Sequence, residues 1–313
     1  MSISIITPHY NGPDGLLQVY KCLLAQTEAT WQWVIVDDLS ELSIRKKIQD
    51  WHEDIEDDRV KLIFNTHKRN ASVCRNIGVD FALYNHIVFL DDDDIISSNF
   101  VANRLIKFQD FAVFQNYSII DKHGNIEIKK PLETRYLNCF LQAKFIWQTS
   151  CILWNRSFFN SIGQFHSQLP RLQDVELAIR ALQQSSDYLV LDNTVDFYYN
   201  VIPIRERQNM LKPVCEAVHL FISELLNTSS LNKEQISLLS GYYYLCVKYL
   251  ERSGSLENVD LVQRNLMLFY KKGYIGLLKC IFGLTVLKLF VWKMLSPSLF
   301  LRINRRIFKP SGT

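Results

Sequence analysis

Short apolar runs alternate with amphipathic segments along the first third of the chain. The runs, typical of buried strands, are Ser2–Thr7, Trp33–Val36, Val60–Phe64 and Ile87–Leu90. The segments whose apolar residues recur at helical spacing are Leu16–Ala25, Ile44–Trp51 and Ser72–Leu83. This alternation predicts a mostly parallel sheet with helices on both faces.

The pattern is mixed beyond residue 110. It predicts a hairpin or strand pair in Phe111–Ile120, broken by a polar DKHGN turn. It also predicts a strongly amphipathic helix over Gln173–Gln184, and strands at Tyr188–Leu191 and Val195–Tyr199. From Arg205 onward the spacing is helical, with a seam expected near Ile202–Arg207. We therefore expect one domain over residues 1–204 and a helical extension over 205–313.

Polar residues follow three of the predicted strands, at Thr7–Asn11, Asp37–Asp38 and Asp91–Asp94. Ligands of parallel sheets bind beyond the carboxyl ends of the strands, so these stretches should converge. The four adjacent carboxylates of IVFLDDDDIISSNF repel one another when ionised. Mg²⁺ and Mn²⁺ prefer oxygen ligands and phosphates, which favours a metal and nucleotide site. The alternative is a solvated acidic turn that caps the next helix.

Composition excludes several classes of protein. The chain has 313 residues, of which 48% are hydrophobic and 21% charged, as in a folded protein, and a net charge of +3 gives no argument for nucleic acid. The 7 cysteines are scattered without a Cys-x-x-Cys pair, which indicates reduced thiols in a cytosolic setting rather than disulfides or zinc. The start MSISIITPHYNG enters a strand directly, so we expect no signal peptide.

Four successive motifs carry a resemblance to a known family. ISIITPHYNG, WVIVDDLS, NASVCRNIGVDFA and IVFLDDDDIISSNFV are similar to those of family-2 glycosyltransferases of the bacterial surface-polysaccharide type, over roughly residues 2–200. The resemblance implies the GT-A fold, a Rossmann-like α/β nucleotide-diphospho-sugar transferase fold. Its mixed, mostly parallel sheet would be flanked by helices and followed by the helical extension. The first domain would divide into a nucleotide-binding half, 1–100, and an acceptor half, 101–204.

The resemblance also implies which residues bind the donor. Those expected to contact the nucleotide sugar are Thr7, His9, Tyr10, Asn11, Asp37, Asp38, Arg75, Asp91 and Asp92. Asp93 is the expected ligand of Mn²⁺ or Mg²⁺, although four consecutive acids let Asp92 or Asp94 share that role. The sequence departs from the family pattern at Asn70 and Leu39, where glycine is usual, and at Cys74, where alanine is usual. Asn70 and Cys74, on the N-terminal side of Arg75, should change the shape of the site without loss of activity. Leu39 leaves the conformation of the turn after Asp37–Asp38 undecided.

The general base is expected in RLQDVELAIRAL, where Asp174 matches the family's catalytic aspartate and Gln173 replaces a common glutamate. The alternative for Asp174 is a charge that favours the helix dipole. Trp147 and Gln173 are the candidate acceptor contacts, although tryptophan is more often a core residue.

These residues imply inverting, metal-dependent transfer from a nucleotide-diphosphate sugar, with a UDP-sugar favoured, to a hydroxyl of a glycan or lipid-linked glycan. One rival is a nucleotidyltransferase, disfavoured because TPHYNGPDG carries no Arg or Lys for a phosphate loop. The other is a nucleotide-sugar-binding scaffold without turnover, disfavoured because the Asp174 carboxylate is present.

The C-terminal stretch is both apolar and basic. Tyr274–Leu295 is interrupted by Lys279, Lys288 and Lys293, which argues against a membrane-spanning helix and for one lying in the membrane plane. Residues that would favour anionic lipid follow it: Arg302, Arg305, Arg306 and Lys309. We expect residues 274–309 to hold the protein on the inner face of the cytoplasmic membrane; the alternative is a helix packed on the extension.

Overall fold

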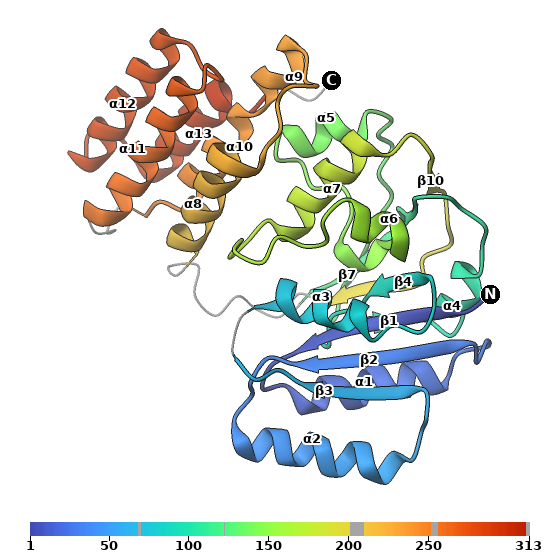
Figure 1. Ribbon diagram of the computed structural model, residues 1–313. Coiled ribbons are helices and arrows are strands. Elements are labelled where there is room, and N and C mark those ends of the chain that lie inside the picture. Colours follow the sequence, from blue (N-terminus) through green and yellow to red (C-terminus); the bar gives the residue numbers. More distant parts are fainter. Residues whose placement is uncertain (68–69, 122, 201–209, 252–255, 311–313) are drawn as a thin grey trace. The chain divides into compact units, whose positions relative to one another are not determined.

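The computed structural model describes residues 1–313 apart from 68–69, 122, 201–209, 252–255 and 311–313 (Figure 1). The chain forms two compact units. The sheet unit comprises residues 1–132, 147–167 and 184–203, and the helical unit comprises 133–146, 168–183 and 204–313. The predicted boundary after residue 204 and the seam near Ile202–Arg207 lie outside the described residues.

The sheet unit is built on a seven-stranded sheet in the order β10-β6-β9-β4-β1-β2-β3. Its strands are β1 (Ile3–His9), β2 (Trp31–Asp37), β3 (Val60–Phe64), β4 (His86–Phe89), β6 (Phe111–Phe114), β9 (Ile152–Asn155) and β10 (Tyr188–Leu191). Only β9 runs antiparallel to its neighbours, β4 and β6. The predicted mixed, mostly parallel sheet is therefore confirmed.

Helices cover both faces of this sheet, as predicted (Figure 1). On one face, Tyr20 of α1 (Pro13–Leu24) and Trp51 of α2 (Leu42–Ile55) pack on Trp33 of β2. On the other face lies α3 (Ala71–Asp80), where a Cβ on Gly78 would fall 2.3 Å from Ile6 Cγ2 of β1. Glycine thus lets α3 approach β1 closely, which fixes the helix that carries Arg75 against the sheet.

A second sheet, in the order β5-β11-β7-β8, completes the sheet unit. It consists of β5 (Ile95–Ile96), β11 (Phe197–Asn200), β7 (Tyr117–Ile120) and β8 (Ile126–Lys129). The expected strand pair in Phe111–Ile120 divides between the sheets, since β6 joins the first sheet, whereas β7 pairs antiparallel with β8, which follows the predicted polar turn. The short helices α4 (Phe100–Arg104) and α6 (Arg156–Ser161) and the 3₁₀ turn η1 (Thr149–Cys151) link these strands. The acidic run between β4 and β5 connects the two sheets.

The helical unit consists mainly of helices from three parts of the chain. They are α5 (Tyr136–Leu141), α7 (Gln173–Gln184), α8 (Leu211–Leu220) with the π turn η3 (Phe221–Leu225), α9 (Lys233–Leu238), α10 (Ser240–Lys248), α11 (Leu256–Lys271), α12 (Leu277–Val291) and α13 (Pro297–Phe308). Tyr242 of α10 donates its hydroxyl hydrogen to the carbonyl of Phe140 in α5, at 2.6 Å. Gln183 of α7 donates to the carbonyl of Asn227, at 3.0 Å. Helices α5 and α7 are thereby fastened to the C-terminal helices. Over the described residues, no helix is long and apolar enough to cross a membrane.

Candidate functional site

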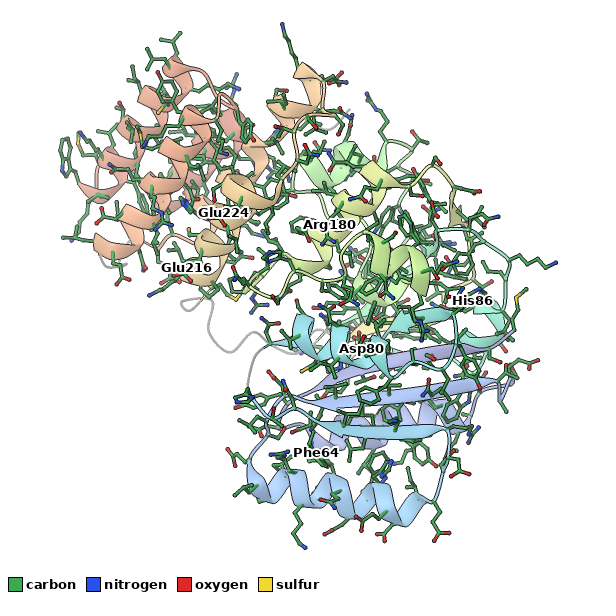
Figure 2. All side chains as sticks on the ribbon, in the orientation of Figure 1. Phe64, Asp80, His86, Arg180, Glu216 and Glu224 are labelled. Atoms are coloured by element: carbon green, nitrogen blue, oxygen red, sulfur yellow. The ribbon has the colours of Figure 1, made fainter. Side chains whose placement is uncertain are left out.

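The three predicted polar stretches meet at one edge of the seven-stranded sheet. Strand β1 runs parallel to both β2 and β4, and the Asp38 amide donates to the His9 carbonyl at 2.8 Å. Figure 2 labels Phe64 at the carboxyl end of β3 and His86 at the amino end of β4, on opposite edges. The polar stretches lie at the carboxyl edge and border a cavity of about 270 Å³. The cavity is lined by Pro8, His9, Tyr10, Asp38, Ala71, Arg75, Asp91, Asp92 and Asp93.

Two of the four adjacent aspartates have a cationic or hydrogen-bonding side chain opposite them. Asp91 accepts a hydrogen bond from the Arg75 guanidinium, which also lies 5.3 Å from the centre of the Phe165 ring. Asp92 Oδ2 lies 2.7 Å from His9 Nδ1. These contacts stabilise the carboxylates of Asp91 and Asp92.

Among the described residues, no side chain that is hydrogen-bonded or ion-paired to them offsets the charge of the other two aspartates. Asp94 is 3% exposed and accepts a backbone hydrogen bond from the Asn200 amide at 3.2 Å. Burial, followed by the charges of Asp91 and Asp93, raises the pKa of Asp94 well above its ordinary value. Burial and the neighbouring carboxylates likewise raise the pKa of Asp93 to about 6. Burial is also the main reason why the pKa of Asp92 is raised, against the hydrogen bond from His9. Within the part of the chain that the structure describes, the run therefore holds more negative charge than its neighbours offset.

This donor set fits a hard divalent cation. One carboxylate oxygen from each of Asp91, Asp93 and Asp94 lies within 4.8 Å of the others. Oxygen ligands and closely spaced carboxylates suit Mn²⁺ or Mg²⁺. Among the described residues, His9 Nε2 and Arg75 Nε are buried without a hydrogen-bond partner, which leaves polar atoms available to a ligand. Asp94 belongs to this cluster, whereas Asp92 is turned toward His9.

Three predicted donor-binding residues do not line the cavity. The Thr7 hydroxyl is buried and accepts a hydrogen bond from the Trp33 indole, at 2.8 Å. Asp37 is fully buried, accepts the backbone amide and hydroxyl of Ser40, and lies 3.5 Å from Arg45 Nε.

Asn11, the third of them, ties the loop after β1 to the loop after β2. Its backbone amide donates to the Ser40 hydroxyl at 2.8 Å, and its side-chain oxygen accepts from the Glu41 backbone amide at 2.9 Å. Thr7, Asn11 and Asp37 thus support the loops that carry the cavity residues. A nucleotide-sugar contact by any of them stays a prediction.

The departures from the family pattern have structural explanations. Asn70 caps α3, accepting from the Val73 amide at 3.1 Å, and its side-chain amide donates to the Ser167 carbonyl. Leu39 adopts φ = 61°, so the backbone keeps the left-handed turn that glycine usually makes. Cys74 is buried, and burial together with Asp38 raises the pKa of its thiol to about 12. A thiol that stays protonated is a poor nucleophile.

The candidate base belongs to the helical unit. Asp174 lies in the first turn of α7, and its negative charge contributes to the raised pKa of the buried Tyr242 hydroxyl, after burial itself. Its neighbour Gln173 donates to the Leu169 carbonyl at 3.1 Å. Further along α7, Glu176 is buried and paired with Arg180, which Figure 2 labels. Asp174 and Glu176 thus share the first turn of α7, and Glu176 is paired with a cation of the same helix.

Trp147, the other candidate acceptor contact, belongs to the sheet unit and is 3% exposed. So little accessible surface is typical of a core tryptophan, and an acceptor role for Trp147 stays a prediction.

The model of the family "Glycosyl transferase family 2" matches residues 4–162, half of the chain. The chain belongs to this family. Among curated relatives, it is 32% identical over 126 residues to the UDP-Glc:alpha-D-GlcNAc-diphosphoundecaprenol beta-1,3-glucosyltransferase WfgD of Escherichia coli, covering 40% of this chain and 46% of the relative. It is 32% identical over 129 residues to the putative teichuronic acid biosynthesis glycosyltransferase TuaG of Bacillus subtilis, covering 39% and 49%. The chain therefore spans about half the length of these relatives.

Solved structures confirm the predicted GT-A fold. The crystal structure of S. aureus TarS 1-349 in complex with UDP-GlcNAc superposes with a TM-score of 0.61 at 13% identity, over 97% of this chain and 91% of that one. The mannosyltransferase PcManGT from Pyrobaculum calidifontis, in complex with GDP-Man and Mn²⁺, gives a TM-score of 0.51 at 15% identity, over 98% and 88%.

Proposed function

We propose that this glycosyltransferase-family protein transfers a sugar from a nucleotide-diphosphate sugar to a hydroxyl of a glycan or lipid-linked glycan, with inversion at the anomeric carbon. The observation that carries the proposal is the carboxylate cluster of Asp91, Asp93 and Asp94 at the carboxyl edge of the sheet, beside a cavity that Arg75 also lines. A UDP-sugar is the favoured donor, because WfgD is named for UDP-Glc and TarS was crystallised with UDP-GlcNAc. WfgD is also named for a diphosphoundecaprenol-linked acceptor, which favours a lipid-linked glycan.

The donor would occupy the cavity at the sheet edge. Asp38, held by a hydrogen bond from the Asn65 side chain at 3.2 Å, would contact the nucleoside, and the half-exposed Tyr10 would pack beside it. The Arg75 guanidinium brings positive charge to the diphosphate. The carboxylate cluster would hold Mn²⁺ or Mg²⁺, which when bound supplies a Lewis acid that stabilises charge on the departing nucleoside diphosphate.

The transfer itself needs one proton acceptor. Asp174 would take the proton of the acceptor hydroxyl while the hydroxyl oxygen forms a bond to the anomeric carbon. The bond from that carbon to the diphosphate oxygen breaks, and its electron pair leaves on the diphosphate. A single displacement inverts the centre and requires no protein nucleophile, in keeping with the protonated thiol of Cys74. General-base catalysis of this kind typically accelerates a reaction by about 10²–10⁴-fold.

Ligand-induced stabilisation followed by a turnover assay tests the proposal. Thermal unfolding would be measured with UDP, GDP and their sugar conjugates, each with and without Mn²⁺. A ligand at about a hundredfold excess over its Kd stabilises the native state by about 2.7 kcal/mol. We expect a metal-dependent shift with a uridine nucleotide, which Asp93→Ala abolishes.

The variant Asp174→Asn separates binding from catalysis. It should keep the nucleotide shift and lower the transfer rate by about 10²–10⁴-fold. Glu257→Gln is the matched control, because Glu257 is also an acid in a first helical turn, and it should leave both readouts unchanged. The absence of a shift with every nucleotide would refute donor binding. A normal shift without transfer would point instead to a nucleotide-sugar-binding scaffold.

A further inference from the structure

Helix α12 carries large apolar side chains on two faces, only one of which is covered. The covered face packs in the helical unit through Cys280, Gly283, Val286, Leu287 and Phe290. The opposite face exposes large apolar side chains: Leu277, Leu278, Ile281, Phe282 and Trp292. Leu278 is 84% exposed and Trp292 66%. Exposed apolar side chains gathered on one face normally mark a surface that binds a partner or a membrane, and this face has no such partner among the described residues.

The exposed face continues onto the neighbouring helix. Helices α11, α12 and α13 lie next to one another (Figure 1), and Phe290 of α12 stacks on Phe300 of α13 with 4.0 Å between ring centres. A groove of about 670 Å³ is lined by apolar side chains of both helices and by one cation from each, namely Leu278, Phe282, Ile303, Ile307, Lys279 and Arg306. The groove thus has apolar walls with positive charge beside them.

The charge around this face has one sign. Residues 271–309 contain no Asp or Glu, and their basic residues are all exposed: Lys271, Lys272, Lys279, Lys288, Lys293, Arg302, Arg305, Arg306 and Lys309. A second copy of the chain would bring the same positive charge to a symmetric interface, which disfavours self-association. An anionic bilayer offers acyl chains that can contact the exposed apolar face and phosphates that can pair with the cations.

We propose that the α12–α13 face binds the surface of an anionic phospholipid bilayer. The exposed side chains of α12 would enter the boundary between headgroups and acyl chains. The surrounding lysines and arginines would pair with lipid phosphates, their stems lying along the apolar surface. The inference does not rest on the proposed transferase activity, because it uses residues far along the chain from the donor cavity.

Vesicle flotation of the full chain tests this surface. The vesicles would be phosphatidylcholine alone, and phosphatidylcholine mixed with phosphatidylglycerol. We expect flotation with the mixed vesicles that weakens as salt is raised. Each cation near an anionic surface contributes about a fivefold gain in binding, so Arg302→Gln with Arg306→Gln should weaken it about 25-fold. Leu278→Glu with Trp292→Glu should abolish it.

Matched controls come from α2 in the sheet unit. Leu42 is 82% exposed, so Leu42→Glu introduces the same change outside the face, and Lys46→Gln with Lys47→Gln removes two exposed cations. Both controls should float like the unmodified protein, and all variants should keep the uridine-nucleotide shift. Flotation with neither vesicle type, or equal losses in the controls, would overturn the proposal. So would a dimer in light scattering that Leu278→Glu converts to monomer, since the face would then be a self-association surface.

Discussion

Replacing Asp93 by asparagine should stabilise the metal-free protein while weakening its metal-dependent nucleotide binding. The carboxylate oxygens of Asp91, Asp93 and Asp94 lie within 4.8 Å of one another. Two ionised carboxylates at that distance repel by about 3 kcal/mol at an effective dielectric constant of about 20. Asp91 is partly exposed, and burial raises the pKa of Asp94 well above its ordinary value, so we expect much of this repulsion to be screened or avoided. We expect a gain of about 1 kcal/mol in unfolding free energy at neutral pH.

The gain should depend on pH with a defined sign. Because the folded-state pKa of Asp93 is about 6, above the ordinary value of 3.8, the folded protein binds this proton more tightly than the unfolded chain. The associated stability is present at low pH and is lost as pH rises through about 4 to 6. The variant should therefore match the unmodified protein near pH 4 and exceed it at pH 7.5.

Urea unfolding in the presence of a chelator, at both pH values, measures this difference. The exposed acid Asp54 on α2 provides the control, since Asp54→Asn relieves no cluster. On adding Mn²⁺ with UDP, the order should reverse, because the unmodified protein gains more from binding. A variant that is less stable than the unmodified protein at pH 7.5 without metal would refute the electrostatic reasoning.

Three further substitutions test the local structure. Leu39→Gly should stabilise the protein by about 0.5–1 kcal/mol in urea unfolding, because φ = 61° strains leucine; a loss of stability would contradict this. Gly15→Ala should cost about 1–3 kcal/mol in unfolding free energy and weaken the Mn²⁺–UDP thermal shift, because the new Cβ would lie 2.2 Å from the Asp92 carbonyl oxygen. Gly12→Ala is the control and should keep the shift, because the nearest atom to its Cβ is 3.6 Å away. Tyr242→Phe should cost about 1–3 kcal/mol in the same unfolding assay by leaving the buried carbonyl in α5 without its hydroxyl donor, and an unchanged free energy would exclude that bond.

Hydrophobic patterning predicted the main sheet because its central strands are buried on both faces. The runs at Ile87–Leu90 and Trp33–Val36 correspond to most of β4 and to part of β2. Strand β1 extends past the predicted run to His9, since beyond Ile6 it pairs with β2 but not with β4, and Pro8 is tolerated there. The second sheet was missed because β5 has two residues and β8, the partner of β7 beyond the predicted polar turn, contains only two apolar residues.

The sequence predicts which polar residues follow the strand ends and therefore converge. It does not predict which partner each of these side chains contacts. Convergence of Asp38 and Asp91 follows from parallel strands alone. Whether Asp92 or Asp94 joins the cluster depends on which way each residue of the turn points, and no periodicity reports that. The burial of Asp37 on Ser40 and Arg45 is likewise a tertiary contact that composition cannot reveal.

The residues of the proposed reaction are divided between the two units, which assigns a role to the C-terminal helices. The carboxylate cluster belongs to the sheet unit, whereas Asp174 begins α7 of the helical unit. At the C-terminal end of α7, Gln183 donates a hydrogen bond to the Asn227 carbonyl. At its N-terminal end, the Asp174 charge contributes to the raised pKa of Tyr242 in α10. Because these partners come from the C-terminal part of the chain, that part would position the base as well as carry the basic, apolar face of α12 and α13.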